Sequence, residues 1–311
     1  MVDENKRIEI DQFKERAVSA APLIREQNAA ADVSGERMTA VFPDRSVSII
    51  YYRSGIQNAP LIIGFHGGGY LYGGNALDDD MWCAVRDALG ADVASVEYRK
   101  SPEHMYRAAL DDAYDVSVYL KERAGELGFD RDKIYVMGES AGAGLAASVC
   151  IYAKRMGNPI YKRQILVYPF LDCDTDPDTK DESIPGGPMM YVFNELHCLP
   201  GESADPLVSP VFADIDELRG LPDATVIYAE NDSLRHEGMK YSSMLREAGV
   251  QVDDMLSRGM PHGFFESGFG DPEKNIQPFM GDDFNRMILD GTIHRASVEA
   301  LDFIKKSVSG R

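Results

Sequence analysis

The sequence predicts an α/β protein with a mostly parallel sheet and helices on both faces. Three observations predict it. Short apolar runs alternate with segments of helical periodicity along most of the 311 residues. Residues 138–142, Gly-Glu-Ser-Ala-Gly, lie between a strand-like run and a helix-forming run, and residues 66–69, His-Gly-Gly-Gly, follow another strand-like run. Strands that alternate with helices favour a parallel sheet covered on both faces.

The N-terminal part is expected to contain helices followed by a hairpin. Apolar side chains recur at mixed helical spacings over residues 8–30, so we expect one or two helices there. Two strand-like runs, residues 37–42 and 47–52, flank a Pro-Asp-Arg turn, which is a hairpin signal. We expect this pair to form the antiparallel edge of the sheet, with a buried strand over residues 61–65.

The rest of the chain continues the alternation. The pattern predicts helices over residues 77–90 and 105–124, a strand over 92–97 between them, and a strand over 133–137 before Ser140 with a helix after it. The later expected elements are strands over 164–168, 224–228 and 251–256, a helix over 236–248 and a closing amphipathic helix over 293–307. We therefore expect one domain, residues 1–311, with an eight-stranded sheet.

Two irregular stretches interrupt this rhythm. Residues 172–210 are rich in Asp, Pro and Gly but contain the apolar run Met189–Phe193, so we expect a lid helix inserted between two strands. Residues 267–291 form a second irregular stretch before the closing helix. Long irregular segments in compact domains are usually functional or mobile.

Composition excludes several classes of partner. The formal net charge is -19 and the isoelectric point is near 4.7, so the field of the protein repels nucleic acid and anionic membranes. The N-terminal residues are charged and lack the apolar core of a signal peptide. No apolar run approaches the roughly 18 residues of a transmembrane helix. We expect a cytoplasmic protein, and a homodimer through strand edges or the closing helices is one assembly that the sequence allows.

The cysteines are expected to be free thiols. Cys83, Cys150, Cys173 and Cys198 show neither C-x-x-C pairing nor the spacing of metal ligands. A disulfide between Cys173 and Cys198 is the alternative, because both lie in residues 172–210. No metal site and no cofactor is expected.

The Gly-Glu-Ser-Ala-Gly motif marks Ser140 as a nucleophile. A strand, a sharp turn and a helix are the context of the G-x-S-x-G elbow of α/β-hydrolases, which exposes the serine hydroxyl. Gly138 and Gly142 leave room for neighbouring backbone because they lack a Cβ. The helix N-terminus then offers free N–H groups to developing negative charge.

The run His66-Gly67-Gly68-Gly69 predicts an oxyanion hole. Successive glycines let the backbone approach a substrate closely, so that N–H groups can point at its carbonyl oxygen. The expected donors are the N–H groups of Gly67, Gly68 and Ala141, the residue after the nucleophile. Three glycines alone are also typical of an ordinary loop, but their place after a strand and before the elbow makes the prediction specific. His66 is expected to make a structural hydrogen bond.

His262 is the expected base and Asp232 the expected acid. In α/β-hydrolases the acid follows the nucleophile along the chain, and a histidine comes after the last strand. His262 lies in such a turn-rich loop, and His197 in the expected lid is its main competitor. Asp232 follows an earlier strand and can fix the tautomer of the imidazole; Glu230 and Glu237 are its neighbouring alternatives.

Together these motifs resemble the hormone-sensitive-lipase-like branch, bacterial family IV, of the α/β-hydrolase carboxylesterases. The resemblance covers about residues 55–265. It rests on His66–Tyr70, Glu97–His104, Ala108–Asp112, Gly138–Gly142, Asp205 to Ser209-Pro210, Asp232–Gly238 and His262–Phe264. It implies that the segment Tyr98–Asp112 braces the elbow and that residues 1–45 contribute to a cap over the pocket.

The chain departs from this family at three places. Glu139 stands before the nucleophile where the family usually has Asp, so its longer side chain must find different partners. Ala143 stands where the family usually has a second Gly after the elbow. The tract 267–291 is longer than the family norm and could reshape the pocket mouth, bind a partner subunit or do neither.

The predicted function is hydrolysis of short-chain acyl esters, acetyl to butyryl, among which acetylated sugars and aryl esters are candidates. An amidase such as an arylformamidase uses the same triad, and a non-catalytic receptor on this fold would lose triad residues. Bulky side chains near the site predict a short acyl pocket, although ordinary packing is the alternative for each of them. These candidates are Tyr70, Tyr72, Met189, Tyr191, Val192, Phe193, Phe264 and Phe265.

Overall fold

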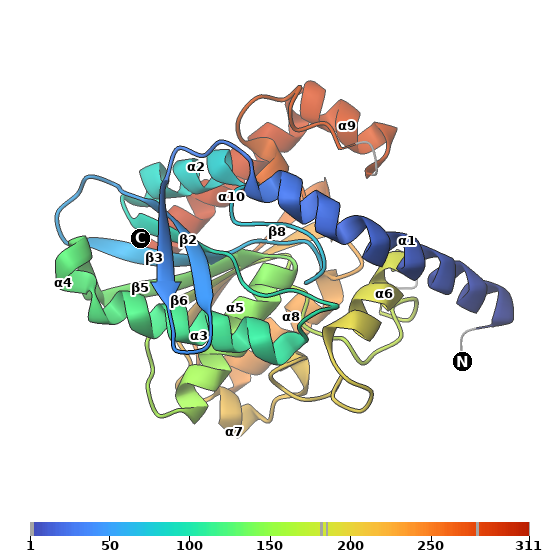
Figure 1. The fold of residues 1–311 in the computed structure, drawn as a ribbon, viewed down its shortest axis with the longest axis horizontal. Coiled ribbons are helices and arrows are strands. Elements are labelled where there is room, and N and C mark those ends of the chain that lie inside the picture. The colour runs from blue at the N-terminus through green and yellow to red at the C-terminus, as the bar shows by residue number, and fades with distance from the viewer. Residues whose placement is uncertain (1–2, 181–182, 185, 278–279, 311) are drawn as a thin grey trace.

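An eight-stranded, mostly parallel sheet forms the centre of the computed structural model, which describes residues 3–180, 183–184, 186–277 and 280–310 (Figure 1). The strand order is β1-β2-β4-β3-β5-β6-β7-β8. The pairs β1–β2 and β2–β4 are antiparallel and the other neighbours are parallel, so the predicted fold class and antiparallel edge are confirmed. The strands are β1 (Glu36–Val41), β2 (Ser46–Tyr52), β3 (Ala59–Phe65), β4 (Asp92–Val96), β5 (Phe129–Glu139), β6 (Arg163–Val167), β7 (Asp223–Asn231) and β8 (Val252–Pro261).

Helices cover both faces of the sheet and divide its core in two. Successive side chains of a strand point to opposite faces, and accordingly Leu61 and Ile63 of β3 belong to one buried cluster whereas Ile62 belongs to the other. The first cluster contains residues of α3 (Tyr106–Glu122), α5 (Ala141–Arg155) and α8 (Arg235–Glu247). The second contains residues of α2 (Asp79–Leu89) and α10 (Thr292–Ser309).

The stretch 267–291, expected to be irregular, contains a helix that the sequence interpretation missed. Helix α9 (Asp282–Leu289) buries Phe284 and Ile288 in the second core cluster. Residues 278 and 279 lie outside the described part. The short elements elsewhere are α4 (Ala124–Leu127), α7 (Ile215–Leu218) and the 3₁₀ turns η1 (Pro210–Phe212) and η2 (Glu266–Gly268).

Two helices far apart in the sequence lie side by side at one end of the molecule. Helix α1 (Glu4–Ala29) is a single helix and contacts α6 (Gly187–His197), as Figure 1 shows. Helix α6 is the helix expected within residues 172–210, of which residues 181, 182 and 185 lie outside the described part. Of residues 1–45, β1 belongs to the sheet edge rather than to this helix pair.

The remaining structural expectations concern cysteines and membrane spans. All four cysteines are free thiols, so the prediction is confirmed against the disulfide alternative. Among the described residues, no helix combines the length and the apolar character that crossing a bilayer requires.

Candidate active site

Ser140 occupies a strained turn between β5 and α5. Its backbone has φ 55° and ψ -119°, a conformation that non-glycine residues rarely adopt and that costs about 1–3 kcal/mol. The Ser140 N–H donates to the Val167 carbonyl oxygen at 2.9 Å, which ties the turn to the end of β6. A Cβ at Gly138 would collide with the Gly142 backbone, and one at Gly142 with the Phe65 carbonyl. The two glycines therefore permit the tight turn that exposes the serine.

The structure brings Ser140, His262 and Asp232 together in one chain of hydrogen bonds. Ser140 Oγ lies 2.9 Å from His262 Nε2, and His262 Nδ1 lies 2.7 Å from Asp232 Oδ2. The residues follow the ends of β5, β8 and β7, which are parallel, so their carboxyl ends meet at one sheet edge. The other Asp232 oxygen accepts the N–H of Leu234 at 2.9 Å. Asp232 is thus fixed from both sides.

The electrostatics of this chain favour a basic histidine. Burial lowers the pKa of His262, but the charge of Asp232 and its hydrogen bond outweigh burial, and the pKa is raised above its ordinary value. With Nδ1–H donating to Asp232, Nε2 is left as an acceptor for the Ser140 hydroxyl. A neutral His262 can therefore take up the hydroxyl proton, and Asp232 stabilises the imidazolium that forms.

The two other histidines considered in the sequence analysis lie in packed surroundings. His66 is buried and stacks on Tyr98 with ring centroids 4.3 Å apart, and its Nδ1 lies 2.7 Å from the Gly67 carbonyl oxygen. Burial, with Lys100 nearby, lowers its pKa to about 3. His197 stacks on Tyr70 at 3.7 Å, and burial lowers its pKa to about 3 as well. The predicted structural role of His66 agrees with these contacts.

The alternative acids are engaged elsewhere. Glu230 Oε2 accepts the N–H of Gly259 at 2.7 Å. Glu237 is buried, accepts the Leu171 N–H at 2.6 Å and pairs with Lys180 at 2.9 Å. Of the three candidates, Asp232 makes the contact with His262.

The glycine loop after β3 corrects one expected oxyanion donor. The Gly67 N–H donates to Glu139 Oε1 at 2.7 Å, so it is not free for a substrate. Within the part of the chain that the structure describes, no group accepts the N–H of Gly68 or Gly69, which have φ of 109° and 61°. A Cβ at Gly67 would lie 3.5 Å from Ser140 Cβ, so the loop lies against Ser140.

Among the residues that the structure describes, the N–H groups of Gly68, Gly69 and Ala141, the first residue of α5, have no acceptor and are therefore the candidate donors. The physical reason for the correction is the side chain of Glu139, which reaches from the elbow to the loop. The sequence carries a signal for this contact, because the side chain of Glu139 is longer than that of the usual Asp and needs different partners.

Two of the expected pocket residues lie at the glycine loop after β3. Phe193 of α6 packs directly over Gly69, where a Cβ would collide with its ring. Tyr72 is half-buried, and its ring meets the Phe193 ring edge to face at 6.3 Å. Helix α6 therefore covers the loop that carries the Gly68 and Gly69 N–H groups.

Of the other expected pocket residues, some pack or bond elsewhere and one is exposed. Tyr191 donates from its hydroxyl to Asp176, and Met189 is 40% exposed. Tyr70 and Val192 are buried in the first core cluster.

Phe264 and Phe265 were expected to line the pocket, and this is corrected. Both are 0% exposed and pack in the second core cluster. The Phe265 ring meets that of Phe269 at 5.3 Å, and the Phe264 carbonyl accepts from Ser297 of α10. These contacts join the loop after β8 to α10 and to the second core cluster.

The segment after β4 makes the contacts of a brace. Asp112 of α3 is fully buried and accepts hydrogen bonds from the Arg99 backbone at 2.9 Å and from the guanidinium groups of Arg99 and Arg45. Tyr98 donates to the His66 carbonyl oxygen at 2.7 Å. This segment is thus joined to the start of the glycine loop and to α3.

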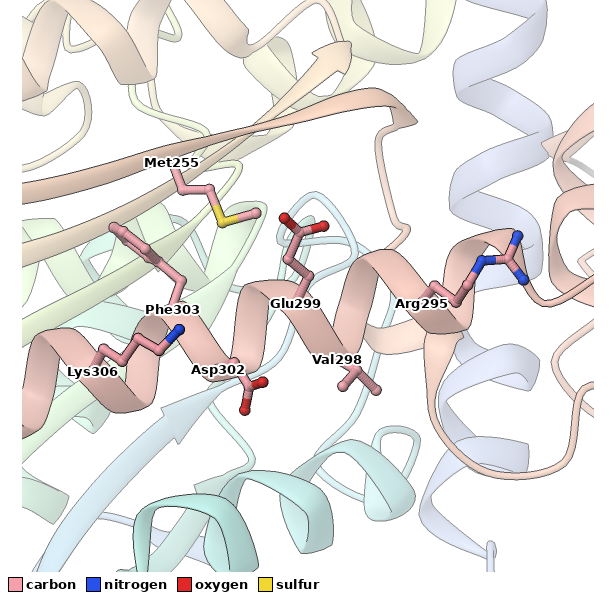
Figure 2. A pocket seen from close by; sticks show the side chains of 7 residues that line it. All are labelled: Met255, Arg295, Val298, Glu299, Asp302, Phe303 and Lys306. Carbon is pink, nitrogen blue, oxygen red and sulfur yellow. The ribbon is translucent and has the colours of Figure 1, made fainter.

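A separate hollow lies between β8 and α10. Figure 2 shows Met255 of β8 facing a row of α10 side chains. Its lining contains neither Ser140, Asp232 nor His262, so it is distinct from the site built around them. The lining residues are Met255, Arg295, Val298, Glu299, Asp302, Phe303 and Lys306.

Comparison with known proteins assigns the class. The matching family model is described as alpha/beta hydrolase fold and spans residues 62–266. The chain belongs to this family, in its hormone-sensitive-lipase-like branch.

Particular relatives carry esterase names. Carboxylesterase NlhH of Mycobacterium tuberculosis is 34% identical over 219 residues, which are 67% of each chain. An arylesterase of Saccharolobus solfataricus is 32% identical over 221 residues, 68% of this chain and 70% of the relative. The solved structure of a Pyrobaculum calidifontis esterase matches with a TM-score of 0.75 and 28% identity, covering 97% of this chain and 92% of that one.

Proposed function

We propose that this protein is a serine carboxylesterase that hydrolyses short-chain acyl esters. The observation that carries the proposal is the hydrogen-bond chain from Ser140 Oγ through His262 to Asp232, placed on a strained elbow beside backbone N–H groups that have no acceptor in the described part of the chain. The relatives named carboxylesterase and arylesterase support the same reaction class.

In the proposed mechanism His262 acts as base and acid in turn, and Ser140 is acylated and then released. His262 Nε2 takes the Ser140 hydroxyl proton as Oγ attacks the ester carbonyl. The N–H groups of Gly68, Gly69 and Ala141 stabilise the oxyanion, and each such donor lowers the barrier by roughly 3–4 kcal/mol. The imidazolium then gives its proton to the leaving alcohol. Water, deprotonated by His262, releases the acid from the acyl-enzyme.

We further propose that α1 and α6 form the cap over this site. The proposal is supported by Phe193 of α6, which packs on Gly69, and by Arg25 of α1, whose Nε donates to the Leu71 carbonyl oxygen at 2.9 Å. Both helices thus contact the oxyanion loop or its continuation. An aromatic ring this close to the site favours small acyl groups, acetyl to butyryl.

Initial rates on p-nitrophenyl esters from acetate to decanoate, with Ser140→Ala beside the wild type, test the function. We expect a maximum at two to four carbons and loss of the burst of p-nitrophenol in the variant. An undiminished burst in Ser140→Ala would refute the role of Ser140. A maximum at long chains would refute the short acyl pocket.

An amidase would use the same triad. Side-by-side rates on a formylated aromatic amine and on a matched formate ester separate the two activities, and faster amide cleavage would replace the esterase proposal. A small-molecule ester as substrate is part of this proposal. The cytoplasmic location and the homodimer remain predictions, tested by cell fractionation and by mass measurement in solution.

A further inference from the structure

Three carboxyl groups gather behind the nucleophile. Glu139, Asp78 and Glu266 come from the end of β5, the residue before α2 and the start of η2. Glu139 is 1% exposed and the other two are partly buried. The side chains of Glu139 and Asp78 lie within hydrogen-bonding reach of each other, and the charge of Asp78 acts on Glu266. We call these three residues the carboxyl cluster.

A hydrogen bond between two carboxyl groups requires a proton on one of them. An ionised carboxylate only accepts hydrogen bonds, whereas a protonated one donates. Glu139 Oε1 accepts the Gly67 N–H, but no N–H or O–H donor in the described ranges reaches the buried Oε2. A full charge left there would be costly to bury.

The side chain of Asp78 does not cap helix α2, although the residue stands at the N-cap position. It occupies the N-cap position of α2, where an Asp side chain normally accepts a hydrogen bond from an N–H of the first turn. Its side chain makes no such bond and is directed to Glu139 instead. The pairing is therefore a specific arrangement that replaces a favourable cap.

The cluster contacts both halves of the proposed catalytic machinery. Glu139 precedes Ser140 and holds the Gly67 N–H at 2.7 Å, which fixes the loop carrying Gly68 and Gly69. On the other side, Glu266 accepts the hydroxyl of Tyr168, whose ring lies 4.7 Å from the His262 ring.

We propose that Asp78 and Glu139 share one proton and that this pair, acting through Gly67, holds the oxyanion loop in its active position, while Glu266 and Tyr168 support His262. Glu139 is thus a positioning residue, since it touches neither the substrate carbonyl nor the Ser140 hydroxyl. This inference rests on the proposed esterase function for its kinetic consequence, but not for the shared proton itself.

The surroundings keep the proton bound at neutral pH. Burial and the neighbouring carboxyls raise the pKa of Glu139 well above its usual range, burial raises that of Asp78 to about 7, and burial with Asp78 raises that of Glu266 to about 8. The titratable or charged groups on the adjoining elements are Tyr98, Tyr168, His262 and His66, with Lys100 and Glu97 beyond His66.

Loss of the shared proton should release the loop. Above these pKa values the carboxylates repel one another, because like charges a few ångströms apart in a buried site cannot both ionise cheaply. The Asp78–Glu139 hydrogen bond then disappears, and Gly67 loses a fixed partner. We therefore expect kcat to fall at alkaline pH while KM changes little.

Two variants of Glu139 distinguish a role in positioning the oxyanion loop from a role in stability alone. Glu139→Gln keeps an oxygen for the Gly67 N–H and supplies its own N–H to Asp78, so it should retain most of kcat and lose the alkaline decline. Glu139→Ala removes both contacts, and its kcat should fall about 10- to 100-fold at constant KM, less than the 10²–10³-fold that deletion of a donor outright costs. Asp79→Asn is the control, because it removes a carboxylate next to Asp78 in the sequence whose side chain bonds Ser34. This variant should keep the wild-type pH profile.

Infrared difference spectra test the proton directly. We compare Ser140→Ala with Ser140→Ala/Glu139→Gln, which needs no turnover. The carbonyl stretch of a protonated carboxyl should be present near neutral pH, vanish on alkaline titration and be missing in the double variant.

Identical spectra for the two proteins, or wild-type kcat and pH profile in Glu139→Ala, would overturn the inference. If the wild type hydrolyses no ester, the proposed function fails, and the spectra still decide whether the proton is shared.

Discussion

Different interactions position the proposed catalytic residues and the proposed cap. Ser140, Asp232 and His262 follow strand ends of one sheet, and Asp232 is only 2% exposed. Helix α6, in contrast, is joined to α1 by partly exposed ion pairs, in which Glu195 meets Arg7 at 2.5 Å and Lys14 at 3.0 Å.

Because of this difference, mutations and salt should affect the two regions differently. A buried hydrogen bond in a site of low dielectric is screened little by salt, whereas an exposed ion pair is worth about 0.2–1 kcal/mol and weakens as salt rises. Changes at the sheet edge should therefore act on kcat and be severe. Changes at the cap should be mild, act on KM and depend on ionic strength.

The largest expected effect is that of Asp232→Asn. The amide keeps the shape of the side chain but favours the wrong tautomer of His262, so kcat should fall about 10³- to 10⁴-fold with KM nearly constant. Thermal unfolding should show a folded protein. Glu230→Gln is the matched control, because Glu230 bonds Gly259 and not His262. Equal losses in both variants would contradict the assignment of the acid.

Gly69→Ala tests the contact between the glycine loop and helix α6 of the proposed cap. The residue has φ 61°, and a Cβ would collide with the Phe193 ring of α6, so the loop must shift and kcat should fall about 10- to 100-fold. Gly55→Ala is the control, since Gly55 has φ 73° but no atom within 4 Å of its Cβ position. That variant should lose stability of about 1 kcal/mol and keep kcat.

A second substitution shows which contact matters. If the collision with the ring causes the loss, Phe193→Ala combined with Gly69→Ala should recover part of kcat. No recovery would mean that backbone strain, rather than the cap, accounts for the defect.

The pH dependence of kcat/KM tests how Asp232 acts on His262 at the sheet edge. His262 acts as a base when neutral, so kcat/KM should rise as pH increases through its pKa and fall about tenfold per pH unit below it. Asp232 raises this pKa above the ordinary 6.5, and the midpoint of the acidic limb should therefore lie above that value. A midpoint well below 6.5 would mean that burial, not Asp232, dominates.

The sequence could predict those parts of the site that depend on order along the chain. Ser140, Asp232 and His262 stand at strand ends, and strand periodicity with the G-x-S-x-G motif is enough to locate such positions. The antiparallel edge was predictable in the same way from the hairpin signal.

Contacts between distant segments could not be predicted in this way. Glu139 accepts the Gly67 N–H because two loops that are distant in the sequence meet in space. The pairing of Asp78 with Glu139 also depends on such a meeting. Aromatic composition likewise cannot distinguish Phe193, which covers the oxyanion loop, from Phe264, which packs in the core. Helix α9 was missed because its two buried residues follow a Gly- and Asp-rich stretch.

The smallest expected effect is that of Glu195→Gln at the cap. The substitution removes the partner of Arg7 and Lys14, and the loss should be no more than about 1 kcal/mol because the pairs are partly exposed. We expect KM for butyrate and longer esters to rise about twofold at low salt, with kcat unchanged, as α6 moves more freely over the site. Added salt should raise the wild-type KM towards that of the variant, since it screens the same pairs. Asp216→Asn breaks an exposed pair with Arg219 at α7 and should leave KM unchanged at every salt concentration. A loss of kcat in Glu195→Gln, or a KM difference that persists in high salt, would mean that the cap is coupled to the chemistry by something other than these ion pairs.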